Sequence, residues 1–318
     1  MNHVIWRLHR NQALFAGAGL AVTSIVIVIS GLSLAHTYHL FQTCAATGSC
    51  GEVPYISNGP GLTSRLIAAS ILVLPGLLGL FWGVPLVAKE LEEGTHVLAW
   101  TQSVTRRHWI LTNIGWALLA AATLGGVMSG LVTWWRTPAN DLYGRLGQAF
   151  DIQGFVPVAY CVFGVALGIA AGVLLKRVLP ALALTLGVLV VVRGAVAIYL
   201  RSHLLTPISL TARGTPELAP DLTRYVTLSR AWLLSERLVN ASGQTLPKGW
   251  TPPSCMGGRL IGNEGTSGCM AAHGYRTVFV YQPDSRFWSL QAIESLVFLA
   301  LAILLLGLAY RALSRRDA

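Results

Sequence analysis

Long apolar runs separated by short polar connections dominate the chain. Six of these runs are long enough to cross a hydrocarbon core, which takes about 20 helical residues. They lie at 13–36, 66–88, 109–134, 155–175, 179–200 and 289–310. Because the apolar residues are clustered rather than dispersed, the pattern predicts an all-α integral membrane protein with six transmembrane helices.

Composition and charge support this class of protein. Of the 318 residues, 53% are hydrophobic and only 11% are charged, whereas a soluble domain has roughly 25% charged residues. The net charge of +10 comes mostly from Arg and Lys placed just beyond the apolar runs, where such residues meet lipid headgroups. No basic stretch interleaved with aromatic residues occurs in a polar segment, so a nucleic-acid partner is not expected.

The basic residues also predict the orientation, because short loops rich in Arg and Lys stay in the cytoplasm. If six spans alternate, ten basic residues fall on one side, against only Arg65, Arg136 and Arg145 in the opposite short loops. The ten are Arg7, Arg10, Lys89, Arg106, Arg107, Lys176, Arg177, Arg311, Arg315 and Arg316. Both termini are therefore predicted to be cytoplasmic.

Segment 201–288 is predicted to form a small disulfide-linked extracellular domain, with a strand at 277–281. Cys44, Cys50, Cys255 and Cys269 all fall on the side predicted to be oxidising, and Cys161 lies within a span. A disulfide is the favoured interpretation for Cys255 and Cys269. For Cys44 and Cys50, free thiols stay open as an alternative.

An acidic connection between the second and third spans suggests a protein partner. It carries Glu90, Glu92 and Glu93, which are three of the thirteen acidic residues in the chain. Anionic lipid of the inner leaflet repels such a cluster, so a basic protein surface explains it better. Gly94 and Thr95 mark a break, after which a short amphipathic helix can lie near the membrane surface.

The chain resembles the bacterial ABC-2-type transporter permeases. The resemblance centres on the coupling region of that family, here 90–96 (ELEEGTH) and 99–106 (AWTQSVTR). It extends to 6–10 (WRLHR), 81–86 (FWGVPL), 134–136 (WWR), 150–154 (FDIQG), 281–283 (YQP) and 286–288 (RFW).

The resemblance implies a permease subunit of the bacterial plasma membrane. It implies an amphipathic inner-leaflet helix at 1–11, spans one to five within 12–200 with a coupling helix at 89–107, and the last span with a cytoplasmic tail at 289–318. It further implies a second permease copy, as a homodimer or a paired permease, contact with membrane lipid, and separate ATP-hydrolysing subunits. The residues expected to couple to the ATPase are Glu90, Glu92, Glu93, Gly94, Thr95, Trp100, Arg106 and Arg107.

The chain has no G-x-x-x-x-G-K-[ST] loop to cradle phosphates. It is therefore expected to be no enzyme and to hold no cofactor or metal of its own, with ATP and Mg on the partner subunit. An apolar path with few charges favours export of hydrophobic or amphipathic compounds such as antibiotics, other drugs or lipids.

Two charged residues interrupt the apolar spans, Arg193 in the fifth and Glu294 in the sixth. A charge in hydrocarbon costs at least ~2.5–3.5 kcal/mol and usually faces a partner or a watery cavity. Both residues can line the export path; alternatively, Arg193 forms a structural pair and Glu294 reaches the outer headgroups.

Other patterns leave their alternatives open. The spacing of Gly164, Gly168 and Gly172 predicts a packing face, either within the chain or between two copies. His36 and His39 can ligate metal or haem as part of a membrane redox subunit, but an interfacial polar pair is the simpler interpretation. A membrane sensor with 201–288 as its receptor is a further alternative, although the cytoplasmic parts are short for a signalling domain.

Overall fold

The computed structural model describes residues 2–47, 61–93, 106–213, 230–247, 250–255 and 265–314. The chain divides into two compact units. Unit 1 comprises Met1–Pro138, Phe150–Ile198 and Gln291–Ala318, and unit 2 comprises Ala139–Ala149 and Tyr199–Leu290. The connection between the third and fourth spans therefore contributes to unit 2 together with the long segment before the last span.

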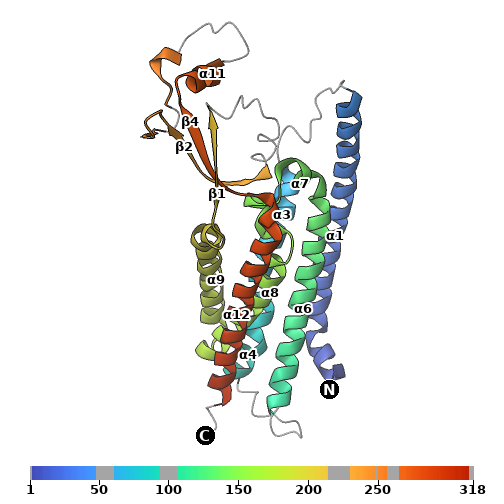
Figure 1. Ribbon diagram of the computed structural model, residues 1–318. Coiled ribbons are helices and arrows are strands. Elements are labelled where there is room, and N and C mark those ends of the chain that lie inside the picture. Colours follow the sequence, from blue (N-terminus) through green and yellow to red (C-terminus); the bar gives the residue numbers. More distant parts are fainter. Residues whose placement is uncertain are drawn as a thin grey trace. The chain divides into compact units, whose positions relative to one another are not determined.

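Six helical segments of the described chain are long and apolar enough to cross a membrane, which confirms the predicted number of spans (Figure 1). The helices that carry them are α1 (Asn2–Thr47), α3 (Leu62–Leu78), α4 (Val84–Glu93), α6 (Arg106–Trp135), α8 (Val156–Leu175), α9 (Val178–Ala195) and α12 (Phe287–Ser314). A π-helical turn, η1 (Gly79–Gly83), joins α3 and α4 into one span, and a second π-helical turn, η3 (Val196–Leu200), follows α9. Within unit 1, α1 begins at the same end of the bundle at which α12 finishes (Figure 1).

Helix α8 is the most enclosed of the six spans. In its most apolar stretch 78% of the residues are buried, against 50% or less in the corresponding stretches of the other five spans. Its glycines explain the close packing. A Cβ atom at Gly164 would overlap the carbonyl oxygen of Pro75, and one at Gly168 would overlap that of Gly79. Small residues let helix backbones approach this closely, so the glycine face of α8 packs within the chain, against α3, η1 and α4.

Helix α1 differs from the expected separation of an amphipathic helix at 1–11 from the first span. It runs without a break from Asn2 to Thr47. Neither Gly nor Pro occurs before Gly17, and these are the residues that most readily interrupt a helix. The expected boundary at residue 11 is therefore absent, and a position of these first turns on the inner leaflet stays a prediction.

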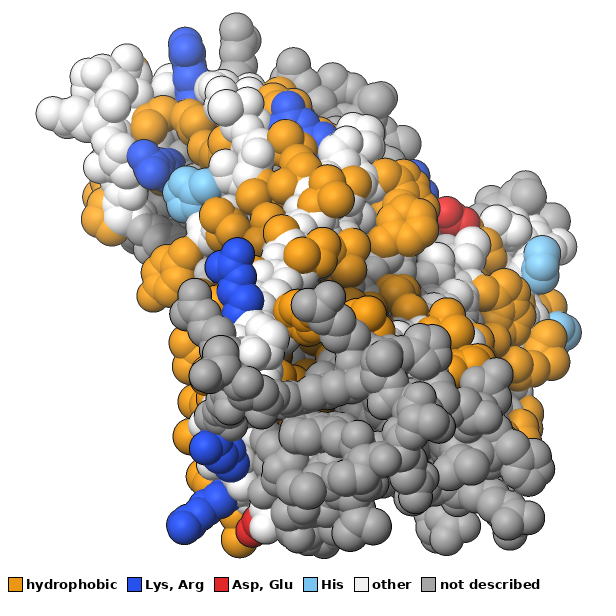
Figure 2. All heavy atoms as spheres, turned by 90° about the horizontal axis from the view of Figure 1, so that it is seen from below, with side chains coloured by type: hydrophobic (Ala, Val, Ile, Leu, Met, Phe, Trp, Pro, Cys, Tyr) orange, Lys and Arg blue, Asp and Glu red, His pale blue; other side chains and the backbone are white. Residues whose placement is uncertain are grey.

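Apolar side chains cover much of the described surface. Leu66, Leu119, Leu179 and Ile303, on four different spans, each expose more than half of their surface. Figure 2 shows hydrophobic side chains spread over the visible described surface, with only a few Lys, Arg and acidic groups among them. An exposed apolar surface of this extent suits lipid as the surrounding medium.

Unit 2 holds an antiparallel sheet, which corrects the prediction of an all-α protein. Its strands are β1 (Ile208–Arg213), β2 (Trp232–Val239), β3 (Thr245–Leu246) and β4 (Arg276–Gln282), in the order β1-β4-β2-β3. The predicted strand at 277–281 corresponds to β4, whose residues pair with both β1 and β2. Strands form here because β-branched and aromatic residues, such as those of Thr277–Tyr281, favour a pleated and half-buried surface.

Two covalent or ionic links hold parts of unit 2 together. A disulfide joins Cys255, at the end of the short helix η6 (Pro253–Cys255), to Cys269 in α11 (Gly265–Ala272), with the Cα atoms 5.8 Å apart. The guanidinium of Arg145 donates from Nε and from a terminal nitrogen to Oδ2 of Asp284, at 3.1 and 2.8 Å. The backbone N–H of Arg145 also donates to Oδ1 of Asp284, at 2.7 Å. Arg145, which lies in a loop predicted to face the outside, is thus fixed in an ion pair.

Candidate functional site

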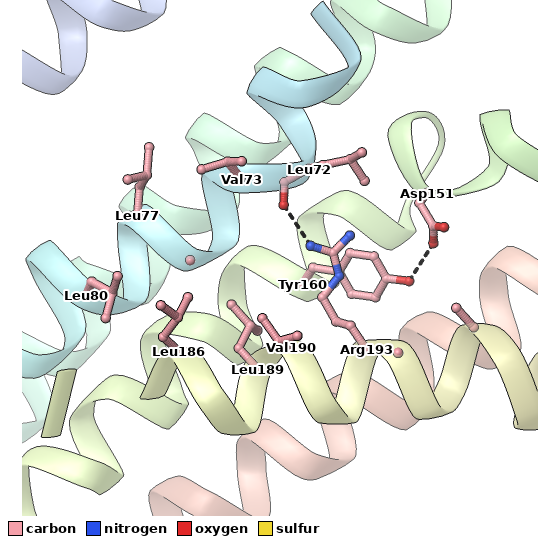
Figure 3. A pocket seen from close by; sticks show the side chains of 13 residues that line it. Leu72, Val73, Leu77, Leu80, Asp151, Tyr160, Leu186, Leu189, Val190 and Arg193 are labelled. Atoms are coloured by element: carbon pink, nitrogen blue, oxygen red, sulfur yellow. Dashed lines mark hydrogen bonds between the residues drawn. The ribbon is translucent and has the colours of Figure 1, made fainter. Parts of the chain in front are cut away.

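Arg193 lies in the last turn of α9 and points toward α3 and α8 (Figure 3). Its guanidinium carbon is 4.2 Å from the centroid of the Tyr160 ring, a distance at which a cation is attracted to the face of an aromatic ring. One terminal nitrogen donates a hydrogen bond to the carbonyl oxygen of Leu72, at 2.8 Å. The arginine therefore binds one backbone oxygen and one ring across three helices.

Tyr160 joins this arginine to two acidic side chains. Its hydroxyl lies 2.5 Å from Oε1 of Glu294 in α12 and 2.9 Å from Oδ1 of Asp151. A phenol has one hydrogen to donate, so the two carboxylates share it. Tyr160 is 1% exposed and Glu294 is completely buried, so this polar cluster lies inside unit 1 and depends on its internal hydrogen bonds.

The segment that carries Asp151 is fixed by buried polar side chains. Gln291 of α12 donates from Nε2 to the carbonyl oxygen of Phe150, at 2.9 Å. Its Oε1 accepts the backbone N–H groups of Phe155 and Val156, at 2.9 and 2.8 Å. These N–H groups begin α8, where an intrahelical partner is lacking. Gln291 therefore positions Asp151 and the start of α8 together.

A cavity of about 390 Å³ opens beside this cluster, between the span of α3 and η1 on one side and α9 on the other. Figure 3 shows Arg193, Tyr160 and Asp151 at one part of it and leucine and valine side chains along the rest. Its lining comprises Leu72, Val73, Gly76, Leu77, Leu80, Asp151, Tyr160, Leu186, Leu189, Val190, Arg193, Gly194 and Ala197. Both π-helical turns contribute to it, η1 through Leu80 and η3 through Ala197, and such turns are frequent at functional sites.

Glu92, at the end of α4, makes a contact that the sequence did not predict. Its Oε2 accepts the backbone N–H of Val178 at 2.9 Å, at the first residue of α9. A carboxylate at a helix N-terminus satisfies a free N–H and meets the positive end of the helix dipole. The acidic connection after the second span is thereby tied to the helix that carries Arg193.

The structure brings together some of the predicted site residues and leaves others outside its description. Arg193 and Glu294 both contact Tyr160, so the two charges of the apolar spans belong to one cluster. The sequence offered no signal for Tyr160, because a tyrosine in an apolar span is unremarkable, and it offered Asp151 only as part of a resembling motif. Gly94, Thr95, Trp100 and Cys50 lie outside the described residues, as do the side chains of Glu90, Glu93, Arg106 and Arg107.

Groups that could hold a metal are few among the described residues. His36 and His39 are both exposed on α1. Cys255, Cys269 and His273 place potential ligand atoms within 4.8 Å of one another. The two sulfur atoms are joined to each other, however, and a metal is bound by the thiolate form of cysteine. Cys44 is also disulfide-bonded.

Comparison with known proteins gives one match. A family described as ABC-2 membrane transporter related matches residues 17–201, which is more than half of the chain and covers the first four spans and nearly all of the fifth. No curated protein and no solved structure matches the chain.

Proposed function

Because the chain belongs to the ABC-2 membrane transporter related family, we propose that it is the transmembrane permease subunit of an ATP-driven exporter. The family match confirms the resemblance to ABC-2-type permeases, and it covers the connection between the second and third spans. The six spans make the chain a multi-pass membrane protein. The cargo we propose is a hydrophobic or amphipathic compound such as an antibiotic, another drug or a lipid.

Energy for transport comes, in this proposal, from a separate ATP-binding subunit that holds ATP and Mg. The chain lacks the G-x-x-x-x-G-K-[ST] loop with which such subunits cradle the nucleotide phosphates. Members of this family generally work with an ATP-binding subunit. A second copy of this chain, or a paired permease, completes the membrane part.

The hydrogen bond between Glu92 and Val178 carries the proposal, since it links the coupling region to the candidate site. A partner that binds Glu90 and Glu93 displaces the end of α4, and Glu92 transmits the displacement to the first residue of α9. Arg193 lies in the last turn of the same helix, so a movement of α9 changes its position over Tyr160. Gly94 and Thr95 allow the chain to turn, Trp100 belongs to the coupling helix, and Arg106 and Arg107 anchor the third span at inner-leaflet phosphates.

Arg193 and Glu294 belong to the translocation path in this proposal, Arg193 as part of its lining and Glu294 through its hydrogen bond to Tyr160. Two observations support it. Arg193 and Tyr160 line a cavity whose wall is mostly apolar, and the hydroxyl of Tyr160 is hydrogen-bonded to Glu294. Charged groups inside a membrane are usually found where a pathway or a watery cavity accommodates them. Cargo enters from the cytoplasm or the inner leaflet and leaves on the outside.

A charge reversal at Glu92 tests the coupling. Glu92→Lys removes the acceptor of the Val178 N–H and places a cation at the positive end of α9, so export is expected to fall about tenfold or more. Glu92→Gln keeps an amide oxygen that can accept the same N–H, and it should retain most of the activity. The measurement is ATP-dependent export in proteoliposomes that contain the chain and its ATPase, with ATP hydrolysis followed in parallel.

Glu236→Lys provides the matched control, because Glu236 is exposed on β2 and the same charge reversal occurs there away from the coupling region. The expected pattern is uncoupling at Glu92 alone, with ATP hydrolysis continuing while export is lost. Normal export by Glu92→Lys would show that this contact does not transmit the movement.

A further inference from the structure

The guanidinium of Arg193 has hydrogen-bonding capacity that the described residues leave unused. An arginine has five N–H donors, and the hydrogen bond to the Leu72 carbonyl engages one terminal nitrogen. The Tyr160 ring offers its face rather than an acceptor atom. Donors that line a cavity in an apolar surrounding are costly to leave unsatisfied, so an occupant of the cavity that supplies an acceptor is favoured.

The charge of Arg193 is already matched within the same cluster. The carboxylates of Asp151 and Glu294 both lie at the hydroxyl of Tyr160, the ring over which the guanidinium is placed. An acidic ligand would add a further negative charge beside these two carboxylates, and a cationic ligand would meet Arg193 itself. The acceptor that suits the site is therefore an uncharged oxygen, such as that of an amide, ester or ketone.

The remainder of the cavity is hydrocarbon. Val73, Leu77 and Leu80 line it from the second span, and Leu186 and Val190 line it from α9 (Figure 3). Its volume of about 390 Å³ lies at the lower end of the roughly 300–1,000 Å³ typical of small-molecule sites. One medium-length aliphatic chain with a compact polar head matches this size.

We propose that the cavity binds an uncharged amphiphile, with a carbonyl oxygen on Arg193 and an aliphatic chain along α3, η1 and α9. This inference names the class of cargo and rests on the proposed function only for the statement that the bound compound is exported. Binding itself requires neither ATP nor the partner subunit.

Photolabelling of the full-length chain in nanodiscs tests the binding. The probe is decanamide with a diazirine at the end of its alkyl chain, and the competitors are unlabelled decanamide, decanoic acid and decyltrimethylammonium, which differ only in the charge and chemistry of the head. Labelled peptides are identified by mass spectrometry. Labelling is expected on α3, η1 and α9. Decanamide should compete about tenfold better than either charged analogue, because decanoate adds a negative charge beside Asp151 and Glu294 and the trimethylammonium head offers Arg193 no acceptor.

Two glycines of α9 give a matched pair of variants. A Cβ atom at Gly194 or at Gly187 meets nothing within 4 Å, so a larger side chain can leave the backbone at both positions without a clash. Only Gly194 lines the cavity. Gly194→Leu should reduce labelling about tenfold by occupying the binding volume, whereas Gly187→Leu should leave it unchanged. Arg193→Met should weaken competition by decanamide, because it removes the donor for the amide oxygen while the carboxylates of Asp151 and Glu294 remain.

Each result decides the inference. Equal or better competition by decanoic acid would assign the site to acidic amphiphiles and overturn the proposal. Labelling that no competitor displaces, or that Gly194→Leu leaves intact, would show that the cavity holds water or bulk lipid. A complex that exports but does not label this cavity would refute only the site, while a chain that labels but never couples to an ATPase would refute only the proposed function.

Discussion

Tyr160 connects the charged residues of the candidate site through two different parts of its side chain. The ring face lies against the guanidinium of Arg193, and the hydroxyl reaches Glu294 and Asp151. The ring is itself held by Phe298, which meets it edge-on with centroids 4.7 Å apart and planes at 76°. Because Phe298 is completely buried, the phenol has little freedom to turn, and the charges around it are fixed in relation to one another.

Removal of the Tyr160 hydroxyl tests its contribution separately from that of the aromatic ring. Tyr160→Phe keeps the ring under Arg193 but deletes the donor shared by two carboxylates, and loss of a buried hydrogen bond to a charged group costs ~1–3 kcal/mol. We expect a lower thermal unfolding midpoint of the purified chain and reduced export. Tyr199→Phe is the control, since Tyr199 is 72% exposed. Equal midpoints for both variants would show that the hydroxyl contributes nothing to the cluster.

The sequence could reveal half of this cluster. Arg193 and Glu294 are visible because a charge inside an apolar run is costly and demands an explanation. Tyr160 carries no such signal, since tyrosine is compatible with an apolar span. The contact between residues far apart in the chain depends on how α8, α9 and α12 pack, and hydropathy alone does not specify the rotation of a helix about its axis. Glu92 was visible as an acidic residue, but its hydrogen bond to Val178 depends on the same packing.

Among the elements, α8 determines how the first half of unit 1 packs. Its glycine face meets the backbone of the second span at Pro75, Gly79 and Val84. The sequence predicted a packing face from the four-residue spacing but left open whether a second copy supplied the partner. The structure places the partner within the chain, because a Cβ at Gly79 would collide with the carbonyl oxygen of Gly164 and one at Gly164 would collide with that of Pro75.

A leucine at Gly168 should disrupt this contact. A Cβ there meets the backbone at Gly79 and Gly83, so the second span has to move, and overpacking of this kind costs ~1–3 kcal/mol or more. The control is Gly130→Leu on α6, where a Cβ meets nothing within 4 Å. Thermal unfolding should show a clear loss of stability for the first variant and none for the second. A destabilised Gly130→Leu and a stable Gly168→Leu would reverse the assignment of the packing face.

The elements of unit 2 were harder to predict than the spans. A span is identified by a run of about 20 apolar residues, whereas a strand of a small domain leaves only a short alternation. One strand, β4, was predicted, and β1, β2 and β3 were not. Segment 139–149 was assigned to a short loop, but it belongs to unit 2 through contacts such as the ion pair of Arg145 and Asp284. This segment belongs to unit 2 because of contacts with residues more than a hundred positions away in the sequence, which its own sequence does not reveal.

At the scale of the whole molecule, the distribution of basic residues determines the expected orientation. If the spans alternate, the two termini and the acidic connection lie on the same side as the basic residues Lys89, Lys176, Arg177 and Arg311. Unit 2 is connected to the other ends, so it is expected on the outside, where its disulfide between Cys255 and Cys269 would persist. The proposal requires this orientation, because an ATPase reaches the coupling region only from the cytoplasm.

Three serine-to-cysteine variants test the orientation of the chain in the membrane. Ser242 is exposed in the turn between β2 and β3, Ser314 is the exposed last residue of α12, and Ser103 belongs to the connection between α4 and α6. A membrane-impermeant maleimide should label Ser242→Cys in intact cells, and it should label Ser314→Cys and Ser103→Cys only after permeabilisation. The native Cys161 is buried and should stay unlabelled in both conditions. An even number of spans places both termini on one side of the membrane. Labelling of Ser314→Cys and Ser103→Cys in intact cells would therefore show that the orientation is the opposite of the predicted one. The coupling region would then be out of reach of any cytoplasmic ATPase.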